Sequence, residues 1–170
     1  MKINARVADS ITRTREQWKA ASPELDTSPM EVIGRILRVE FFARESIRKA
    51  LQRFEVDLGG CDVLATLRRS GPPFRLTPTA LYRELLLTSG AMTNRLDVLE
   101  HSGLVERQID PNDRRGTLIE LTKKGRTLID RVMQFHMENE AQMIAHLSRT
   151  DQKRLAELLK KLLKGMEEQK

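Results

Sequence analysis

Apolar side chains recur along most of this chain at the spacing of an α-helix. Within residues 28–54, Val32, Ile36 and Val39 follow one another at three- or four-residue intervals, which places them on one face of a helix. Leucines and a methionine repeat in the same way over residues 155–166. The chain is therefore predicted to be mainly helical.

Capping residues, prolines and glycines predict where the helices begin and end. Ser28-Pro29 and Thr77-Pro78 each place a capping hydroxyl before a proline that suits the first helical turn. Gly59-Gly60 is expected to break the chain, and Gly103 has the position of a glycine that ends a helix. The expected helices span about residues 3–20, 28–54, 61–70, 78–86, 89–101 and 123–146, and a last one opens at residues 148–150.

The pattern changes to that of β-structure after residue 103. Residues 104–109 and 117–121 each resemble a short strand, and the polar residues 110–116 between them form a turn. Two short helices followed by such a hairpin are typical of a winged helix-turn-helix, in which the second helix enters the major groove of DNA and the hairpin is the wing. The predicted fold class is mostly α with a small β-hairpin wing.

The predicted elements form a single domain, residues 1–170, with a DNA-binding core in its middle. Residues 57–121 hold the winged helix-turn-helix, and residues 1–56 and 122–170 are expected to form a helical dimerisation region. A chain of 170 residues cannot easily bury all of the apolar stripes alone, and a second copy would cover them. A two-fold homodimer also allows two recognition helices to read a palindrome.

Composition narrows the class of partner. The chain has 30 Lys and Arg against 24 Asp and Glu, a formal net charge of +6, which favours a polyanion such as nucleic acid. Composition alone does not separate DNA from RNA, or nucleic-acid binding from plain solubility. Aromatic residues make up only 4%, too few to bind single strands mainly by base stacking. No apolar run approaches the roughly 20 residues of a membrane span, and residues 1–8 do not resemble a signal peptide. We expect a cytoplasmic protein with double-stranded DNA, not a membrane, as its partner.

Residues 76–107 resemble the core of a MarR-type transcriptional regulator, and residues 110–125 resemble that family's wing and the start of the next helix. The resemblance covers nearly the whole chain. It implies a dimeric repressor that binds a palindromic operator. It also implies that DNA affinity falls when a small aromatic or phenolic ligand, or an oxidant, acts on the protein.

The residues expected to touch DNA lie on the recognition helix and at the wing. Met92, Leu96 and Leu99 share the inward face by their spacing, so the opposite face carries small and polar residues that can approach base edges. A solvated helix face would have the same composition. The predicted DNA-binding residues are Ser89, Gly90, Thr93, Asn94, Arg114 and Arg115.

An arginine in the wing turn suits the narrow, negative minor groove. The family resemblance implies that Arg115 enters this groove while Asp113 holds its guanidinium. A turn also favours charged residues for other reasons, so the Arg114-Arg115 pair alone indicates little. Lys123, Lys124 and Arg126 are expected to be contacts to the DNA backbone or solvated charges.

Arg95 is the feature that suggests a ligand. It lies one turn from Met92 and Leu99, at the edge of the face expected to be buried, where an unpaired guanidinium is unfavourable. Asp62 and Arg69 are candidate partners, two turns and about 10 Å apart along the third helix. These three groups could hold a planar anion, or they could form an ion network that only joins two helices.

The resemblance is more specific to the urate-responsive, PecS-like branch of the MarR family. Four ligand positions of that branch match Trp18, Asp62, Arg69 and Arg95, and the chain departs from it at Cys61, where an aromatic residue is more usual. The resemblance therefore implies urate or a similar planar aromatic anion as effector. If the charges are only structural, Trp18 would be an ordinary core residue.

Other functions are weaker interpretations. An enzyme is not expected, because the three histidines lack metal-ligand spacing, and neither a glycine-rich phosphate loop nor a nucleophile elbow is present. No cofactor or metal is predicted. A redox-sensing regulator acting through Cys61 is an alternative, although a buried packing role fits a lone cysteine better. A non-specific architectural DNA-binding protein is another.

Overall fold

A computed structural model describes residues 8–85, 89–111 and 113–169 of the 170-residue chain. The chain divides into two compact units, Met1–Ser46 and Ile47–Lys170, with the boundary inside helix α2 (Ile33–Leu51). The first unit holds α1 (Ser10–Ala21) and the short 3-10 helix η1 (Ser28–Glu31). No helix among the described residues is long and apolar enough to cross a membrane.

Ion pairs and a helix cap organise the 1–46 unit. Asp9 caps α1 by accepting a hydrogen bond from the Thr12 N–H at 2.8 Å, and Arg35 donates to the same carboxylate at 2.8 Å. The Thr12 N–H and Arg35 lower the pKa of Asp9 to about 2. Arg15 donates to the carbonyl oxygen of Thr27 at 3.1 Å. The predicted helix over residues 3–20 is observed from Ser10, and residues 1–7 lie outside the described part.

The helix predicted over residues 28–54 is interrupted at both ends. Ser28 does not cap α2, because its N–H and hydroxyl bind the carboxylate of Asp26 at 2.8 Å and 3.0 Å, and it begins η1 instead. At the other end, residues 52–54 form a second 3-10 helix, η2 (Gln52–Phe54), and Glu55 adopts a left-handed conformation with φ of 53°. The apolar repeat therefore predicted the helical character but not these tighter turns.

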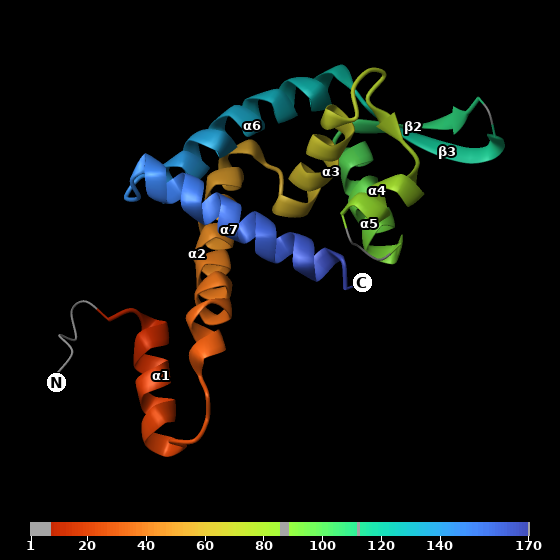
Figure 1. The fold of residues 1–170 in the computed structure, drawn as a ribbon. Coiled ribbons are helices and arrows are strands. Elements are labelled where there is room, and N and C mark those ends of the chain that lie inside the picture. Colours follow the sequence, from red (N-terminus) through yellow and green to blue (C-terminus); the bar gives the residue numbers. More distant parts are fainter. Residues whose placement is uncertain (1–7, 86–88, 112, 170) are drawn as a thin grey trace. The chain divides into compact units, whose positions relative to one another are not determined.

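The 47–170 unit contains the winged helix-turn-helix and the two C-terminal helices. In chain order its elements are α3 (Leu58–Arg69), β1 (Arg75–Leu76), α4 (Pro78–Glu84), α5 (Ser89–His101), β2 (Val105–Asp110), β3 (Asp113–Leu121), α6 (Lys123–Met143) and α7 (Arg149–Glu167). Figure 1 shows the β2–β3 hairpin extending beyond α3, α4 and α5. The predicted fold class is confirmed.

The sheet has the antiparallel order β1-β3-β2. In the hairpin, Val105 pairs with Leu121 and Asp110 pairs with Asp113. The two-residue strand β1 pairs with the end of β3, where Arg75 lies opposite Glu120 and Leu76 opposite Ile119. The sequence did not predict β1, because two residues are too few to show a period of two.

The prediction that Gly59-Gly60 breaks the chain is wrong. Asp57 caps α3 by accepting from the Gly60 N–H at 2.7 Å, so both glycines lie in its first turn. Both are buried, and a Cβ on Gly60 would lie 2.9 Å from Oδ1 of Asp57 and 3.3 Å from Leu99. The glycines therefore allow close packing rather than ending a helix.

The other predicted helix boundaries are close to those observed. Thr77, Thr122 and Ser148 each accept a hydrogen bond from an N–H three residues later, at 3.0–3.1 Å. Gly103 ends α5 with φ of 67°, where its N–H binds the Glu100 carbonyl oxygen and the next N–H binds that of Leu99. This is the Schellman arrangement, in which glycine avoids the strain of a left-handed backbone.

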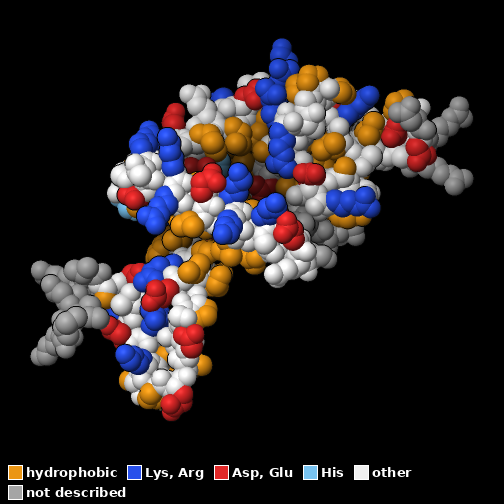
Figure 2. All heavy atoms as spheres, in the orientation of Figure 1, with side chains coloured by type: hydrophobic (Ala, Val, Ile, Leu, Met, Phe, Trp, Pro, Cys, Tyr) orange, Lys and Arg blue, Asp and Glu red, His pale blue; other side chains and the backbone are white. Residues whose placement is uncertain are grey.

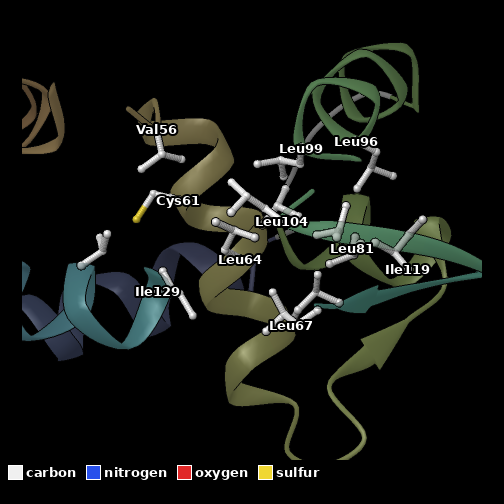
Figure 3. Packing of buried hydrophobic residues seen from close by; sticks show 14 of the residues in the cluster. Val56, Cys61, Leu64, Leu67, Leu81, Leu96, Leu99, Leu104, Ile119 and Ile129 are labelled. Atoms are coloured by element: carbon white, nitrogen blue, oxygen red, sulfur yellow. The ribbon is translucent and has the colours of Figure 1, made fainter. Parts of the chain in front are cut away.

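The core of the 47–170 unit lies where α3 meets the helix-turn-helix, the sheet and α6. Figure 3 shows Leu64 and Leu67 of α3 packed among Leu81, Leu96, Leu104, Ile119 and Ile129. Leu64, Leu67, Leu81, Ile119 and Ile129 are completely buried. Arg68 ties α3 to α6 by donating to Asp130 at 2.7 Å. This core holds α4, α5 and the base of the wing as one unit.

Candidate DNA-binding surface and effector site

Helix α5 has one buried and one exposed face. Met92, Leu96 and Leu99 are only 1%, 2% and 3% exposed, which confirms the face predicted from their spacing. The exposed residues include Gly90, Thr93, Asn94 and Asp97. Small and polar side chains on one face of a helix allow it to approach base edges closely.

Three predicted DNA contacts have side chains that lie outside the described part of the structure. Ser89 begins α5, whereas Arg114 and Arg115 lie in β3, next to the Asp110–Asp113 pair that closes the hairpin. Their position in the chain puts them at the start of the helix and at the wing tip. Their contacts with DNA stay a prediction.

The wing is joined to α5 through Arg107 of β2. Nη2 of Arg107 donates to Oδ1 of Asp97 at 2.5 Å, Nη1 pairs with the Glu100 carboxylate, and the Arg107 N–H donates to Oε1 of Glu100 at 3.2 Å. The hydrogen bond to Asp97, reinforced by the charges of both carboxylates, raises the pKa of Arg107. Sequence reasoning missed this contact, because its partners lie on separate elements.

Arg95 is half-buried, as its place at the edge of the buried face of α5 predicted. Its guanidinium lies on the backbone of Gly59 in α3, since a Cβ added there would come within 2.1 Å of the Arg95 Cζ. Arg95 also lines a cavity of about 450 Å³ between α5 and the start of α3, together with residues that include Asp57, Asn94 and Val98. Any group that enters this cavity meets the recognition helix directly.

Arg69 faces a different element from Arg95. It is exposed, and its Nη2 lies 3.2 Å from Oε2 of Glu84, the last residue of α4. Arg69 and Glu84 line a cavity of about 510 Å³ at the end of α3. The structure therefore places the two predicted ligand arginines in separate cavities, each in contact with one helix of the helix-turn-helix.

The other two predicted ligand residues are also solvent-accessible. Asp62 is exposed on α3, and Trp18 of α1, in the 1–46 unit, is 45% exposed. A tryptophan exposed to this extent is not an ordinary core residue, which was the alternative interpretation of Trp18.

Cys61 is buried in α3 with 5% of its surface exposed. Burial, together with the smaller effect of the nearby Asp62 and Asp57 carboxylates, raises the pKa of its thiol to about 11. Because the thiolate is the reactive form, this environment suppresses reaction with oxidants. The geometry is that of a packing cysteine.

The basic residues at the start of α6 are partly engaged within the protein. Nζ of Lys124 donates to the carbonyl oxygen of Ser102 at 2.7 Å, and the Arg126 guanidinium lies 4.7 Å from the centre of the Phe74 ring. Lys123 is exposed. Figure 2 shows Lys and Arg side chains spread among acidic ones on the visible face of the 47–170 unit, not collected in one patch. Among the described residues, no cluster of His, Cys, Asp and Glu could hold a metal ion.

Comparison with known proteins identifies the family. Residues 61–116 match the MarR family model. The transcriptional regulator PecS of Dickeya dadantii is 35% identical over 151 residues, which cover 89% of this chain and 91% of PecS. This chain belongs to the MarR family. Residues 61–116 are the part of the chain that holds α4, α5 and most of the wing, so the match includes the exposed face of α5.

Solved structures of MarR-family proteins have the same fold. A mutant of E. coli MarR complexed with operator DNA superimposes with a TM-score of 0.69 at 26% identity, covering 86% of this chain and 97% of that one. AbsC, a MarR family regulator from Streptomyces coelicolor, reaches a TM-score of 0.74 over 84% of this chain and 97% of its own, at 21% identity.

As a MarR-family member, the protein is a DNA-binding transcriptional regulator and not an enzyme. The geometry of α5 and the wing fits this role: a helix with a polar, exposed face is fixed by its apolar face to a rigid core. Within the family, the state of Cys61 argues against the redox-sensing alternative.

Proposed function

We propose that this protein is a cytoplasmic, homodimeric repressor that binds a palindromic operator and releases it on binding urate or a similar planar aromatic anion. In this proposal residues 57–121 form the DNA-binding core, and residues 1–56 and 122–170 form the dimerisation region. The proposed DNA contacts are those of α5 and the wing: Ser89, Gly90, Thr93, Asn94, Arg114 and Arg115.

The observation that carries the effector proposal is the place of Arg95. This cation belongs to the recognition helix, yet its guanidinium lies on Gly59 of α3 and lines the cavity between the two helices. An anion that binds Arg95 competes with this packing. It therefore changes the contact through which α3 positions α5.

Arg69 provides a second link to the helix-turn-helix. Its ion pair with Glu84 is exposed, so exchanging this carboxylate for an anionic ligand requires little free energy. Glu84 ends α4, and loss of the pair removes one surface contact between that helix and α3. Because the two arginines line separate cavities, an anion bound at Arg69 acts on α4 and an anion bound at Arg95 acts on α5. Since about 1.4 kcal/mol corresponds to a tenfold change in affinity, a modest preference for the released arrangement is enough.

Asp62 and Trp18 complete the proposed set. The Asp62 carboxylate can accept hydrogen bonds from the ring N–H groups of urate, and a tryptophan offers a ring face and one N–H donor to a planar ligand. The similarity to PecS, which covers most of both chains, supports placing this chain in the branch whose resemblance implies these four positions.

The test is a urate titration followed in two ways. Trp18 is the only tryptophan of the chain, so quenching of its fluorescence reports binding near it. Gel shifts on the region upstream of the protein's own gene report DNA release, with salicylate as a second ligand. We expect quenching and release by urate in the wild type, and a need for at least about tenfold more urate in Arg69→Ala and Arg95→Ala.

Variants at Arg68 and Gly59 serve as comparisons for the urate response of Arg69→Ala and Arg95→Ala. Arg68→Ala removes the neighbouring arginine, whose partner is Asp130 rather than Glu84, and is expected to leave the urate response intact. Gly59→Ala displaces the Arg95 guanidinium and is expected to weaken the response, but to have no further effect in the Arg95→Ala background. If millimolar urate neither quenches wild-type fluorescence nor releases DNA, the effector proposal is overturned.

A further inference from the structure

The contact between Arg107 and α5 joins the two parts of the protein that face DNA. Arg107 lies on β2, on the same side of the strand as Val105, which is buried in the core at 2% exposure. From this base the hairpin runs on to its tip, and at about 3.3 Å per residue the tip lies roughly 10 Å further along the strand. A small rotation at Arg107 is therefore magnified at the wing tip.

The contact joins one guanidinium to two carboxylates on two turns of the helix. Asp97 and Glu100 are three residues apart on α5, so their carboxylates lie on adjacent turns and converge on one guanidinium. The Arg107 N–H adds a third hydrogen bond, to Oε1 of Glu100 at 3.2 Å. Two charge-assisted hydrogen bonds from the side chain and one from the backbone fix both the distance and the angle between strand and helix.

Stability of the fold does not account for this arrangement. The Arg107, Asp97 and Glu100 side chains are 33%, 57% and 37% exposed, and ion pairs this accessible contribute little to folding. The core already holds α5 to the sheet through the buried side chains of Leu96, Leu99 and Val105. What the contact adds is the orientation of the wing relative to the recognition helix.

The charges also matter for DNA. Asp97 lies on α5 one turn after Thr93 and Asn94, and an uncompensated carboxylate there would repel phosphates. Arg107 is held by two carboxylates, so it is not available as a phosphate contact. Asp97 is in turn engaged by Arg107 and is not available to read a base.

We infer that Arg107 is a positioning residue for DNA recognition: through Asp97 and Glu100 it fixes the angle between wing and recognition helix, and so determines the sequence that the two read together. It touches no base itself. This inference rests on DNA binding by the family but not on any effector, so its test uses no ligand.

The experiment is selection from a random-sequence duplex library by the full-length protein, followed by affinity measurements on the enriched sequence and on a scrambled duplex. The variants are Arg107→Met, Arg107→Lys, the pair Asp97→Asn with Glu100→Gln, and the triple variant Arg107→Met, Asp97→Asn, Glu100→Gln. We expect Arg107→Met to lose roughly tenfold in the ratio of specific to scrambled affinity and to enrich a broader set of sequences.

The remaining variants separate positioning from charge. If positioning is the role, the pair variant broadens selection although it leaves Arg107 in place, and the triple variant stays broad although no carboxylate is left to repel DNA. Arg107→Lys keeps one ion pair and recovers part of the preference. Arg68→Met is the matched control: it removes an arginine that is 35% exposed and also ion-paired, but to α6, and is expected to select the wild-type sequence.

Three results would overturn the inference. The first is recovery of the wild-type preference by the triple variant, which would reduce Arg107 to a charge neutraliser. The second is an equal loss on all sequences with a shallower salt dependence, which is the behaviour of a phosphate contact. The third is wild-type selection by a folded Arg107→Met variant. If the wild type itself enriches no sequence, the operator proposal fails together with this inference.

Discussion

At the scale of single residues, the surroundings of a side chain decide its chemistry more than its type does. Cys61 has the residue type of a redox sensor, but it is 5% exposed and the pKa of its thiol is raised to about 11. At pH 8 about one molecule in a thousand carries the thiolate. Cys61 acts as a small apolar residue of α3 in the hydrophobic core, and its thiol is unreactive.

We therefore expect peroxide to have no effect on DNA binding by the wild type. Cys61→Ala should bind DNA as tightly as the wild type, with or without peroxide. The native protein should react with a thiol-specific chromogenic disulfide far more slowly than the protein unfolded in guanidinium, and the rate should rise with pH towards 11. Fast stoichiometric labelling of the native protein at pH 8, with loss of DNA binding, would contradict this prediction.

Arg115 at the wing is expected to contribute to DNA affinity. Arg115→Ala should weaken operator binding by about 1–3 kcal/mol, because it removes a cation from the minor groove. The control is Arg154→Ala, which removes the same charge from an exposed position on α7. Gel shifts at two salt concentrations measure both. Equal affinity of the two variants would mean that only net charge matters.

At this scale the sequence predicted which face of a helix carries a residue, but not the side chain with which that residue pairs. The spacing of Met92, Leu96 and Leu99 correctly gave the buried side of α5. It could not show that Arg69 pairs with Glu84, because that contact depends on how α3 and α4 pack. Hydrophobic periodicity describes one helix or strand at a time, so it cannot predict ion pairs between elements.

At the scale of elements, capping hydroxyls predicted three helix starts correctly and failed at Ser28, whereas the glycine signal was right at Gly103 and wrong at Gly59-Gly60. The caps at Thr77, Thr122 and Ser148 follow from local hydrogen bonding alone, so the sequence sufficed. Gly59-Gly60 was misjudged because two adjacent glycines usually indicate a turn, whereas here close packing requires them. A glycine that makes room for a neighbour has the same local signal as one that ends a helix.

Gly90 of α5 allows a test of close approach to DNA. Apart from its chain neighbours and the backbone of its own helix, no atom of the described residues would lie within 4 Å of a Cβ at Gly90. Alanine is a better helix former than glycine by up to about 1 kcal/mol, so Gly90→Ala should melt at the same or a higher temperature. It should nevertheless bind the operator more weakly, because the added methyl group points to the exposed face.

Gly165→Ala on α7 is the matched control, since a Cβ at Gly165 also has no neighbour within 4 Å. It should change stability in the same direction and leave DNA affinity unchanged. Thermal melting and gel shifts on both variants decide the matter. If Gly90→Ala binds the operator as tightly as the wild type, this part of α5 does not approach the bases closely.

At the scale of the whole molecule, the apolar stripes predicted from the sequence are real, but a single chain does not cover them. Leu155, Leu158, Leu159 and Leu163 of α7 are 42–59% exposed. A pattern of apolar positions predicts that a helix face is buried, but it does not identify the surface that buries it. A second copy of the chain is the covering surface that the proposed palindromic operator requires.

We expect the wild type to sediment as a dimer at micromolar concentration and the variant Leu159→Asp, Leu163→Asp as a monomer. Burial of a leucine side chain is worth about 1.5–3 kcal/mol, and a two-fold interface loses each of them twice. A carboxylate in its place must also be desolvated. Because both leucines are exposed in the single chain, the monomer should stay folded, and circular dichroism checks this.

The control variant, Lys160→Asp with Lys161→Asp, makes a larger change of charge on exposed positions of the same helix and is expected to remain a dimer. The monomeric variant should then bind one half-site weakly and lose most of its affinity for the full operator, because the two recognition helices are no longer linked. A folded Leu159→Asp, Leu163→Asp variant that still sediments as a dimer would show that α7 lies outside the interface. The first place to look would then be the exposed apolar residues of α2, which include Leu37, Val39, Phe41 and Phe42.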